Sequence, residues 1–371
     1  MNKVIVSVTN DLSTDQRVDK VCNTLYGMGF RVTLVGRKLP ESRDLENRAY
    51  ATHRMKLLFR KGPMFYAEYN LRLFIYLLSH QCNLLVSNDL DTLLANFLVR
   101  KLKGIPLVYD SHEYYTETPE LVNRPAVKRI WERIERYIFP KLTDIITVNQ
   151  SIASLYEEKY GKHLNVVRNI PRAATAIVEK TRKELGLPED KKIVLMQGAG
   201  INIQRGAEEA IEAIRSVENA MLLIIGGGDV IGSLKQQAAH PELSKKVMFL
   251  PKMPYQELMQ YTRVADIGLT LDKDTNINYR FSLPNKLFDY IHAGIPVLAS
   301  RLPEISRIVE DYNIGMITES HQPAEIARII KLMLNDDAKS AIWKNNLAKV
   351  ANELTWENEE KVLKSVYQKY V

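Results

Sequence analysis

A stretch of the sequence that begins at Ser282 combines residue types that bind phosphate with the start and stop signals of a helix. Ser282 and Pro284 suit the helix start, and Gly294 suits the left-handed position just past its end. The first turn of such a helix offers free backbone N–H groups and a positive dipole end, which bind anions. Lys286 adds a positive charge there, and Asp289 lies on the same face. The pattern predicts a phosphate site; an ordinary helix with a surface Lys286–Asp289 pair is the alternative.

Two glycine-rich turns earlier in the chain could also bind phosphate. Gly198, Arg205 and Gly206 follow one apolar run, and Gly226, Gly227 and Gly228 follow the next. Glycine lets backbone approach a ligand closely, and arginine can hold a phosphate through two hydrogen bonds. Because the carboxyl ends of parallel strands converge on one crevice, we expect these turns to share a ligand, although glycine at such turns often has only a steric role.

The elements that must position these residues alternate between apolar strands and helical-period segments. In the first half the expected strands are 4–8, 31–35, 84–87, 106–109 and 145–148. In the second half they are 193–197, 221–225, 247–250, 266–271, 296–300 and 315–318. This alternation predicts α/β architecture with two Rossmann-like parallel-sheet domains, divided near Asn169–Pro171. The segment from Trp356 to Tyr370 has apolar residues at helical spacing and should bury one face.

The amino-acid composition favours a globular protein without a disulfide framework. The 371 residues are 46% hydrophobic and 26% charged, which is typical of a globular chain. Two cysteines are too few for a disulfide framework, so we expect a reducing, cytoplasmic setting, without a secretory signal or a membrane span. Residues 1–170 hold 25 Lys and Arg against 18 Asp and Glu, which is the whole net charge of +7. The excess indicates an anionic partner for this half or a solvated basic face.

Taken in order along nearly the whole chain, the motifs resemble those of GT-B fold glycosyltransferases of the group 1 (GT4-like) type, in a bacterial polysaccharide-synthesis branch. Besides the turns above and Ser282–Ser300, the matching stretches are Val8–Val18, Tyr109–Glu113, Thr143–Asn149 and Val167–Pro171. The resemblance implies an acceptor domain over 1–170, a nucleotide-sugar donor domain over 171–352, and a C-terminal helix over 353–371 that packs back on the first domain. The reaction would take place in the cleft between the two domains, and we expect no nucleic-acid partner.

The resemblance also implies roles for individual residues. Arg205 and Lys286 would hold the pyrophosphate, His112 would approach the donor sugar, and Asp289 would bind the ribose. The remaining donor-side residues implied are Gly198, Gly206, Gly226, Gly227, Gly228, Asn285 and Leu287. The chain departs from the family at two positions: Phe281 stands where the first glutamate of a Glu-x7-Glu pair is usual, and Ala199 stands where a second arginine is usual.

The resemblance implies neither a cofactor nor a metal, because fixed cations and helix N–H groups can stabilise a departing nucleoside diphosphate. Asp272 and Asp274 superficially resemble a metal-binding pair, but the sequence offers them no supporting ligands. The family mostly retains the anomeric configuration of the transferred sugar.

On the acceptor side, Asp11, Asp15 and Arg17 are candidates to orient a hydroxyl group, or they cap the helix that begins near Gln16. His112 has the alternative of a loop histidine without chemistry. The segment Arg54–Leu78 is basic and rich in aromatic residues, which fits either an anionic membrane surface at the inner face of the cytoplasmic membrane or a core helix with a basic rim.

Two other functions stay open at the level of sequence. Phe281 and Ala199 would suit an inactive donor-binding partner of another glycosyltransferase. A sugar-nucleotide epimerase of the same fold shares the overall pattern, but its acidic and histidine residues are not evident here.

Overall fold

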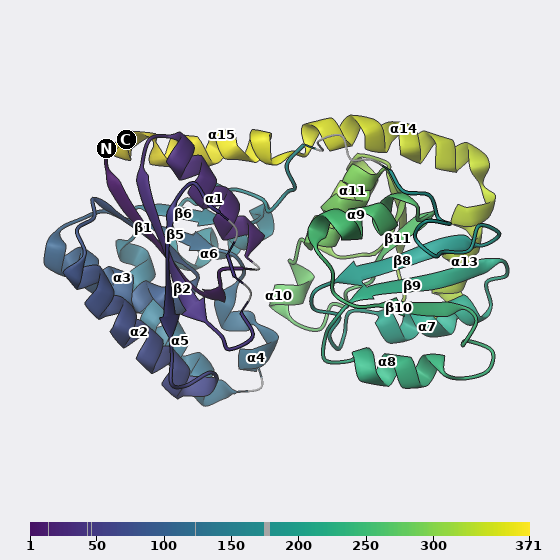
Figure 1. Cartoon of the computed structure of the whole chain (residues 1–371), viewed down its shortest axis with the longest axis horizontal. Helices are drawn as coiled ribbons and strands as arrows, with labels where there is room; N and C mark the ends of the chain where they lie inside the picture. The colour runs from purple at the N-terminus through teal and green to yellow at the C-terminus, as the bar shows by residue number, and fades with distance from the viewer. Residues whose placement is uncertain (14, 43, 46, 123, 174–178) are drawn as a thin grey trace. The chain divides into compact units, whose positions relative to one another are not determined.

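The computed structural model describes residues 1–371 except 14, 43, 46, 123 and 174–178. It divides into two compact units. Unit 1 contains residues 1–169 and 359–371, and unit 2 contains residues 170–358. Each unit is an α/β structure in which helices flank a parallel sheet (Figure 1).

The sheet of unit 1 has the strand order β3-β2-β1-β4-β5-β6-β7, and the paired strands are parallel. Its strands are β1 (Lys3–Asp11), β2 (Arg31–Lys38), β3 (Ala51–Lys56), β4 (Leu84–Asn88), β5 (Leu107–Ser111), β6 (Asp144–Thr147) and β7 (Asn165–Val166). The central strands are near-continuous apolar runs, as expected for a sheet covered on both faces. Our sequence analysis did not find β3, because this edge strand is mostly exposed and has no apolar run.

The helices of unit 1 alternate with most of its strands, although β3 follows β2 directly. They are α1 (Gln16–Gly27), α2 (Gly62–Ser79), α3 (Leu90–Lys103), α4 (Pro119–Val122), α5 (Pro125–Ile138) and α6 (Gln150–Tyr160), with short 3-10 turns at Tyr115–Glu117, Phe139–Lys141 and Gln368–Tyr370. The side chain of Asp15 accepts a hydrogen bond from the Val18 N–H, which confirms the predicted cap of α1. Thr14, in the same loop, lies outside the described residues.

The sheet of unit 2 has the parallel order β10-β9-β8-β11-β12-β13. Its strands are β8 (Lys192–Gly198), β9 (Ala220–Gly226), β10 (Val247–Leu250), β11 (Ile267–Thr270), β12 (Val297–Ser300) and β13 (Gly315–Thr318). Its helices are α7 (Ala207–Arg215), α8 (Ile231–Ala238), α9 (Tyr255–Arg263), α10 (Ile277–Arg280), α11 (Asn285–Ala293), α12 (Pro303–Asp311), α13 (Pro323–Asn335) and α14 (Asp337–Glu353). Helix α15 (Trp356–Tyr367) is part of unit 1 from Glu359 onward.

Two separate apolar clusters cover the two faces of the second sheet. Val194 and Leu222 belong to one cluster, whereas their neighbours Ile193 and Leu223 belong to the other. This alternation is what successive residues of a strand produce when both faces are buried. Polar and charged side chains that end these strands therefore gather at the carboxyl edge of the sheet.

Helix α11 begins two residues later than the sequence suggested, because its N-cap is Pro284 and not Ser282. Pro284 is its N-cap and makes no side-chain capping bond, while the Ser282 hydroxyl donates to the carbonyl of Tyr279. The prediction that Ser282 caps this helix is therefore wrong, because Ser282 closes the turn that follows α10 instead. Gly294 does occupy the left-handed C-cap position, with φ of 73°. Within the described residues, no helix is both long and apolar enough to cross a membrane.

Candidate functional site

A charged cluster in unit 2 joins three residues from different parts of the sequence. Asp272, just after β11, is fully buried and lies 2.6 Å from Nη1 of Arg205 and 3.3 Å from Nζ of Lys286. Burial alone would raise the pKa of the Asp272 carboxyl, but the charges of Lys286 and Arg205 outweigh burial and lower it. The cluster therefore holds two cations against one carboxylate, with a net charge of +1.

Arg205 and Lys286 approach this carboxylate from different elements. Arg205 precedes α7, and its guanidinium carbon lies 4.2 Å from the ring centre of Tyr279. Lys286 lies in the first turn of α11, where burial lowers the pKa of its amine in spite of Asp272. The structure thus brings the two predicted phosphate-binding cations together. Lys286 pairs with Asp272, so the simple alternative of a surface Lys286–Asp289 pair is not what the fold contains.

Asp289 faces a different set of partners. Its carboxylate accepts hydrogen bonds from the Gln197 amide and the Tyr255 hydroxyl, each at 3.0 Å. Gln197 is itself held by Thr262, whose hydroxyl donates to the Gln197 side-chain oxygen at 2.7 Å. Asp289 is buried, with 7% of its surface exposed. Its predicted role toward a ribose stays a prediction.

The glycine turns of unit 2 are packed against one another. A Cβ at Gly226, where φ is 139°, would lie 1.8 Å from the carbonyl oxygen of Gly198. A Cβ at Gly228 would lie 2.0 Å from the carbonyl oxygen of Ile201, and one at Gly206 would lie 2.4 Å from the carbonyl oxygen of Leu271. These contacts require glycine whatever the turns bind. Gly227 differs, because its Cβ would meet only the flexible side chain of Lys252.

The first turn of α11 offers backbone groups in addition to the side chain of Lys286. Leu287 is fully buried in the apolar core, and its N–H bonds to the carbonyl of Pro284. Pro284 has no N–H, so the backbone amides at the start of α11 begin with Asn285. The first turn therefore combines backbone N–H donors with the positive charge of Lys286.

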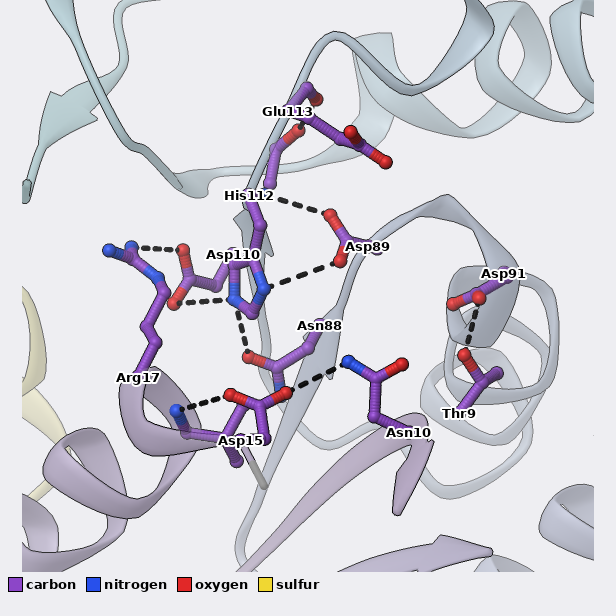
Figure 2. Close-up of polar contacts among 12 residues, drawn as sticks. Thr9, Asn10, Asp15, Arg17, Asn88, Asp89, Asp91, Asp110, His112 and Glu113 are labelled. Carbon is purple, nitrogen blue, oxygen red and sulfur yellow. Dashed lines mark hydrogen bonds and ion pairs between the residues drawn. The ribbon is translucent and has the colours of Figure 1, made fainter. Parts of the chain in front are cut away.

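In unit 1 the polar residues gather around His112, which follows β5 (Figure 2). Asp89, just after β4, accepts the backbone N–H of His112 at 2.8 Å and lies 3.3 Å from its ring Nδ1. Nε2 of the ring lies 3.2 Å from Oδ1 of Asn88 and 3.6 Å from Asp110. The Asn88 amide is oriented by its own Nδ2, which donates to the carbonyl of Ser7 at 3.0 Å.

Both ring nitrogens of His112 therefore face oxygen acceptors. A neutral imidazole has one donor and one acceptor nitrogen, so this environment favours the doubly protonated ring. Burial alone would lower the pKa of His112, but Asp89 and Asp110 outweigh it and raise the pKa to about 9. The geometry suits a fixed positive charge and does not suit a general base at neutral pH.

Arg17 completes the cluster from the opposite side. Its guanidinium donates to Asp110 and to the carbonyl of Val167, each at 2.7 Å, and the residue is 4% exposed. The predicted acceptor-side role of Arg17 stays a prediction, and the geometry favours positioning of Asp110 and through it His112.

The two other predicted acceptor-side residues lie near the end of β1. Asp11 is bound by Arg54 at 3.0 Å and by the Ser42 hydroxyl at 2.6 Å. Asp15 caps α1 and accepts a hydrogen bond from Asn10 at 2.9 Å.

The sequence did not reveal the residues that hold the candidate site residues in position. Asp272 was considered only as half of a metal-binding pair, and Asn88 and Asp89 were not considered. The available signal was position, since each directly follows the apolar run of a parallel strand. Asp89 also has φ of 57°, a conformation that non-glycine residues adopt only where the surroundings enforce it.

Comparison with known families agrees with this architecture. Residues 177–350 match the family described as glycosyl transferases group 1, and residues 15–173 match glycosyltransferase family 4. The chain belongs to the group 1 glycosyltransferases, as the sequence motifs predicted.

Individual relatives are distant. The 2-deoxystreptamine glucosyltransferase of Streptomyces kanamyceticus is 22% identical over 68% of this chain and 67% of its own length. Among solved structures, the sucrose-phosphate synthase of Thermosynechococcus elongatus aligns with 100% of this chain and 99% of its own, at a TM-score of 0.81 and 17% identity. Anabaena HepE in complex with UDP-glucose covers 100% of both chains, at a TM-score of 0.74 and 15% identity. These structures have the GT-B fold, which confirms the predicted fold class.

Proposed function

We propose that the protein transfers a sugar from a nucleotide-sugar donor to a saccharide or lipid-linked acceptor in cell-surface polysaccharide synthesis. The observation that carries this proposal is the pairing of Arg205 and Lys286 with the buried Asp272 beside the first turn of α11. HepE, a structural neighbour, was solved with UDP-glucose, which supports a donor of this class.

The cluster has the electrostatics that a departing nucleoside diphosphate requires. Negative charge develops on the diphosphate as the sugar–oxygen bond breaks, and preorganised cations stabilise that charge most effectively in a desolvated site. Asp272 holds both cations in place before the ligand arrives, so little reorganisation is needed. The residual charge of +1 and the amides of α11 would then face the phosphates.

We further propose that the reaction retains the anomeric configuration and needs no metal. Both carboxylate oxygens of Asp272 already pair with cations of the chain, Arg205 and Lys286. These cations stand where a metal bound to Asp272 would stand, which supports a reaction without a metal. We expect the rate to be unchanged in excess chelator. A strict requirement for a divalent metal would contradict this part of the proposal.

A lipid-linked acceptor would place the enzyme at the inner face of the cytoplasmic membrane. Within the segment 54–78, helix α2 buries Phe65 and Tyr69, but other apolar side chains of the segment are exposed. The exposed ones are Leu58, Phe59, Met64, Leu71, Ile75 and Leu78, beside the exposed cations Arg60, Lys61 and Arg72. A surface of this kind suits an anionic bilayer. Flotation with phosphatidylglycerol vesicles at low salt tests it, and absence of binding would remove the membrane contact.

Calorimetry against UDP, GDP, ADP and their sugars tests the central proposal, together with transfer or hydrolysis assays of the purified chain. Replacing Lys286 with Gln should lower the rate about 10²–10³-fold, because one stabilising charge is lost from the transition state. Lys331→Gln is the matched control, since Lys331 is exposed on α13. Absence of binding by any of these nucleotides would overturn the proposal. Binding without turnover would indicate an inactive donor-binding partner instead.

A further inference from the structure

Unit 1 contains a cavity of about 380 Å³ beside the segment proposed to contact a membrane, and the proposed function assigns it no ligand. It lies where β2 and β3 end, beside the first turns of α2. Because the sheet is parallel, this is the same edge that carries His112 after β5. The lining residues are Arg37, Lys38, Leu39, Pro40, Lys56, Leu57, Phe59, Arg60 and Phe65.

Four of the lining residues are cations without a counter-charge. Among the described residues, the side chains of Arg37, Lys38, Lys56 and Arg60 make neither an ion pair nor a hydrogen bond. Nε of Arg37 is buried and still lacks a hydrogen-bond partner in the described part of the chain. A buried donor without a partner is costly, and a ligand that accepts its hydrogen bond removes that cost.

Two carboxylates on the elements around this pocket, Asp11 and Glu68, are engaged by other partners among the described residues. Asp11, at the end of β1, is engaged by Arg54 and Ser42. Glu68 of α2 accepts the N–H groups of Leu58 and Phe59 and pairs with Arg72 at 2.8 Å. Glu68 thereby fixes the loop that carries Phe59 against α2, so this wall of the pocket is formed before any ligand binds.

The rest of the lining is apolar and aromatic. The guanidinium carbon of Arg37 lies 5.0 Å from the ring centre of Phe65, which keeps the charged group beside an aromatic wall. Leu39, Leu57 and Phe59 add further apolar surface. The pocket is small for a peptide or an oligonucleotide, and it combines several positive charges with an apolar wall.

We propose that this pocket binds a phosphate ester whose other end is apolar or ring-shaped, and that this ester is the sugar acceptor. Multiply charged phosphate oxygens match four cations better than a single carboxylate does, and arginine binds phosphate through two hydrogen bonds. That the ester is the acceptor rests on the proposed function; the binding of phosphate in unit 1 does not.

Titration of the full-length chain with phenyl phosphate tests the pocket, and inorganic phosphate shows how much the apolar wall contributes. Arg60→Gln should weaken phenyl phosphate binding about tenfold or more, since a charge-assisted hydrogen bond is lost. Lys61→Gln, which removes a charge from the next residue outside the lining, should leave it unchanged. Arg37→Gln should have the larger effect, and Arg60, exposed in a loop, provides the variant that preserves folding.

The second cationic site, in unit 2, requires its own control. If phenyl phosphate binds instead beside Asp272, Lys286→Gln abolishes the signal and Arg60→Gln preserves it, and this overturns the proposal. Retained nucleotide binding in Arg60→Gln, with phenyl phosphate binding lost, supports the pocket. A chain that binds phenyl phosphate here but no nucleotide would contradict the proposed function and leave the phosphate pocket standing.

Flotation distinguishes a lipid source from a soluble one. Vesicles of phosphatidylcholine with phosphatidic acid are compared with vesicles of equal charge that contain phosphatidylglycerol, for the wild type and Arg60→Gln. Arg60-dependent binding that favours phosphatidic acid over phosphatidylglycerol indicates a lipid phosphate, whereas phenyl phosphate binding without this preference indicates a soluble phosphorylated acceptor. If neither probe depends on Arg37 or Arg60, the pocket does not bind phosphate esters.

Discussion

At the scale of single residues, the candidate side chains depend on buried counter-charges that hold them. His112 lies between Asp89 and Asp110, and Arg205 and Lys286 share Asp272. Taking one partner from such a pair leaves an uncompensated buried charge, which costs more than the pair itself contributes. The charge state of each candidate residue is therefore a property of its partners.

The protonation of His112 gives a pH-dependent prediction. Its pKa of about 9 lies above the ordinary value, so its pairing stabilises the fold fully below about pH 6.5, and this contribution is lost as the pH rises through about 9. Asp89→Asn should return the ring pKa toward its ordinary value. NMR titration of the ring protons measures this, with His112→Gln to assign the resonance. An unchanged titration in Asp89→Asn would show that Asp89 does not hold the proton.

Asp91 provides a second pH effect of the same sign. Burial, reinforced by Asp89, raises its pKa to about 8, while the Thr9 hydroxyl donates to it at 2.5 Å. The folded protein keeps a proton that the unfolded chain releases above about pH 4, so stability falls as pH rises from there to about 8. Asp91→Asn should flatten this decline in thermal unfolding between pH 5 and 8. The exposed Asp190→Asn serves as control, and an equal slope in all three proteins would refute the assignment.

At the scale of elements, the turns after β8 and β9 are held by backbone contact. Gly228→Ala places a methyl group against the Ile201 carbonyl and should destabilise unit 2 by about 1–3 kcal/mol. Gly232→Ala is a matched control, because its Cβ meets open space in α8 and should stabilise the helix by up to about 1 kcal/mol. Thermal unfolding distinguishes the two. Equal stability of both variants would mean that the turn is less constrained than its geometry indicates.

At the scale of the whole molecule, the chain returns to unit 1 at its C-terminus. Glu359 pairs with Arg168, Lys369 pairs with Asp144, and Leu363 and Tyr367 are fully buried. A chain that ends after Asn358 should lose at least about 3 kcal/mol of unit 1 stability, because two large buried side chains are removed. Hydrogen exchange in β1 and β6 measures this, and a chain that lacks only the exposed Val371 is the control. Unchanged exchange would show that the segment is dispensable.

The local pattern of the sequence was sufficient for the fold class and for several local features. Alternating strands and helices predicted two parallel-sheet units, Asp15 was correctly predicted to cap α1, and Gly294 was correctly predicted to end α11. These features depend on neighbours within a few residues, so hydrophobic period and capping chemistry reveal them. Edge strand β3 escaped detection because it buries little.

Long-range partners were decided only by the tertiary structure. Asp272 meets Arg205 from 67 positions away, and Arg17 meets Asp110 from 93 positions away. The cavity beside Arg37 exists only because two strand ends and a helix start come together. A carboxylate in a loop has the same local sequence whether it faces water, a metal or two cations. Only the packing of strand ends at one edge of a sheet determines which of these it meets, and with it the charge that a ligand encounters.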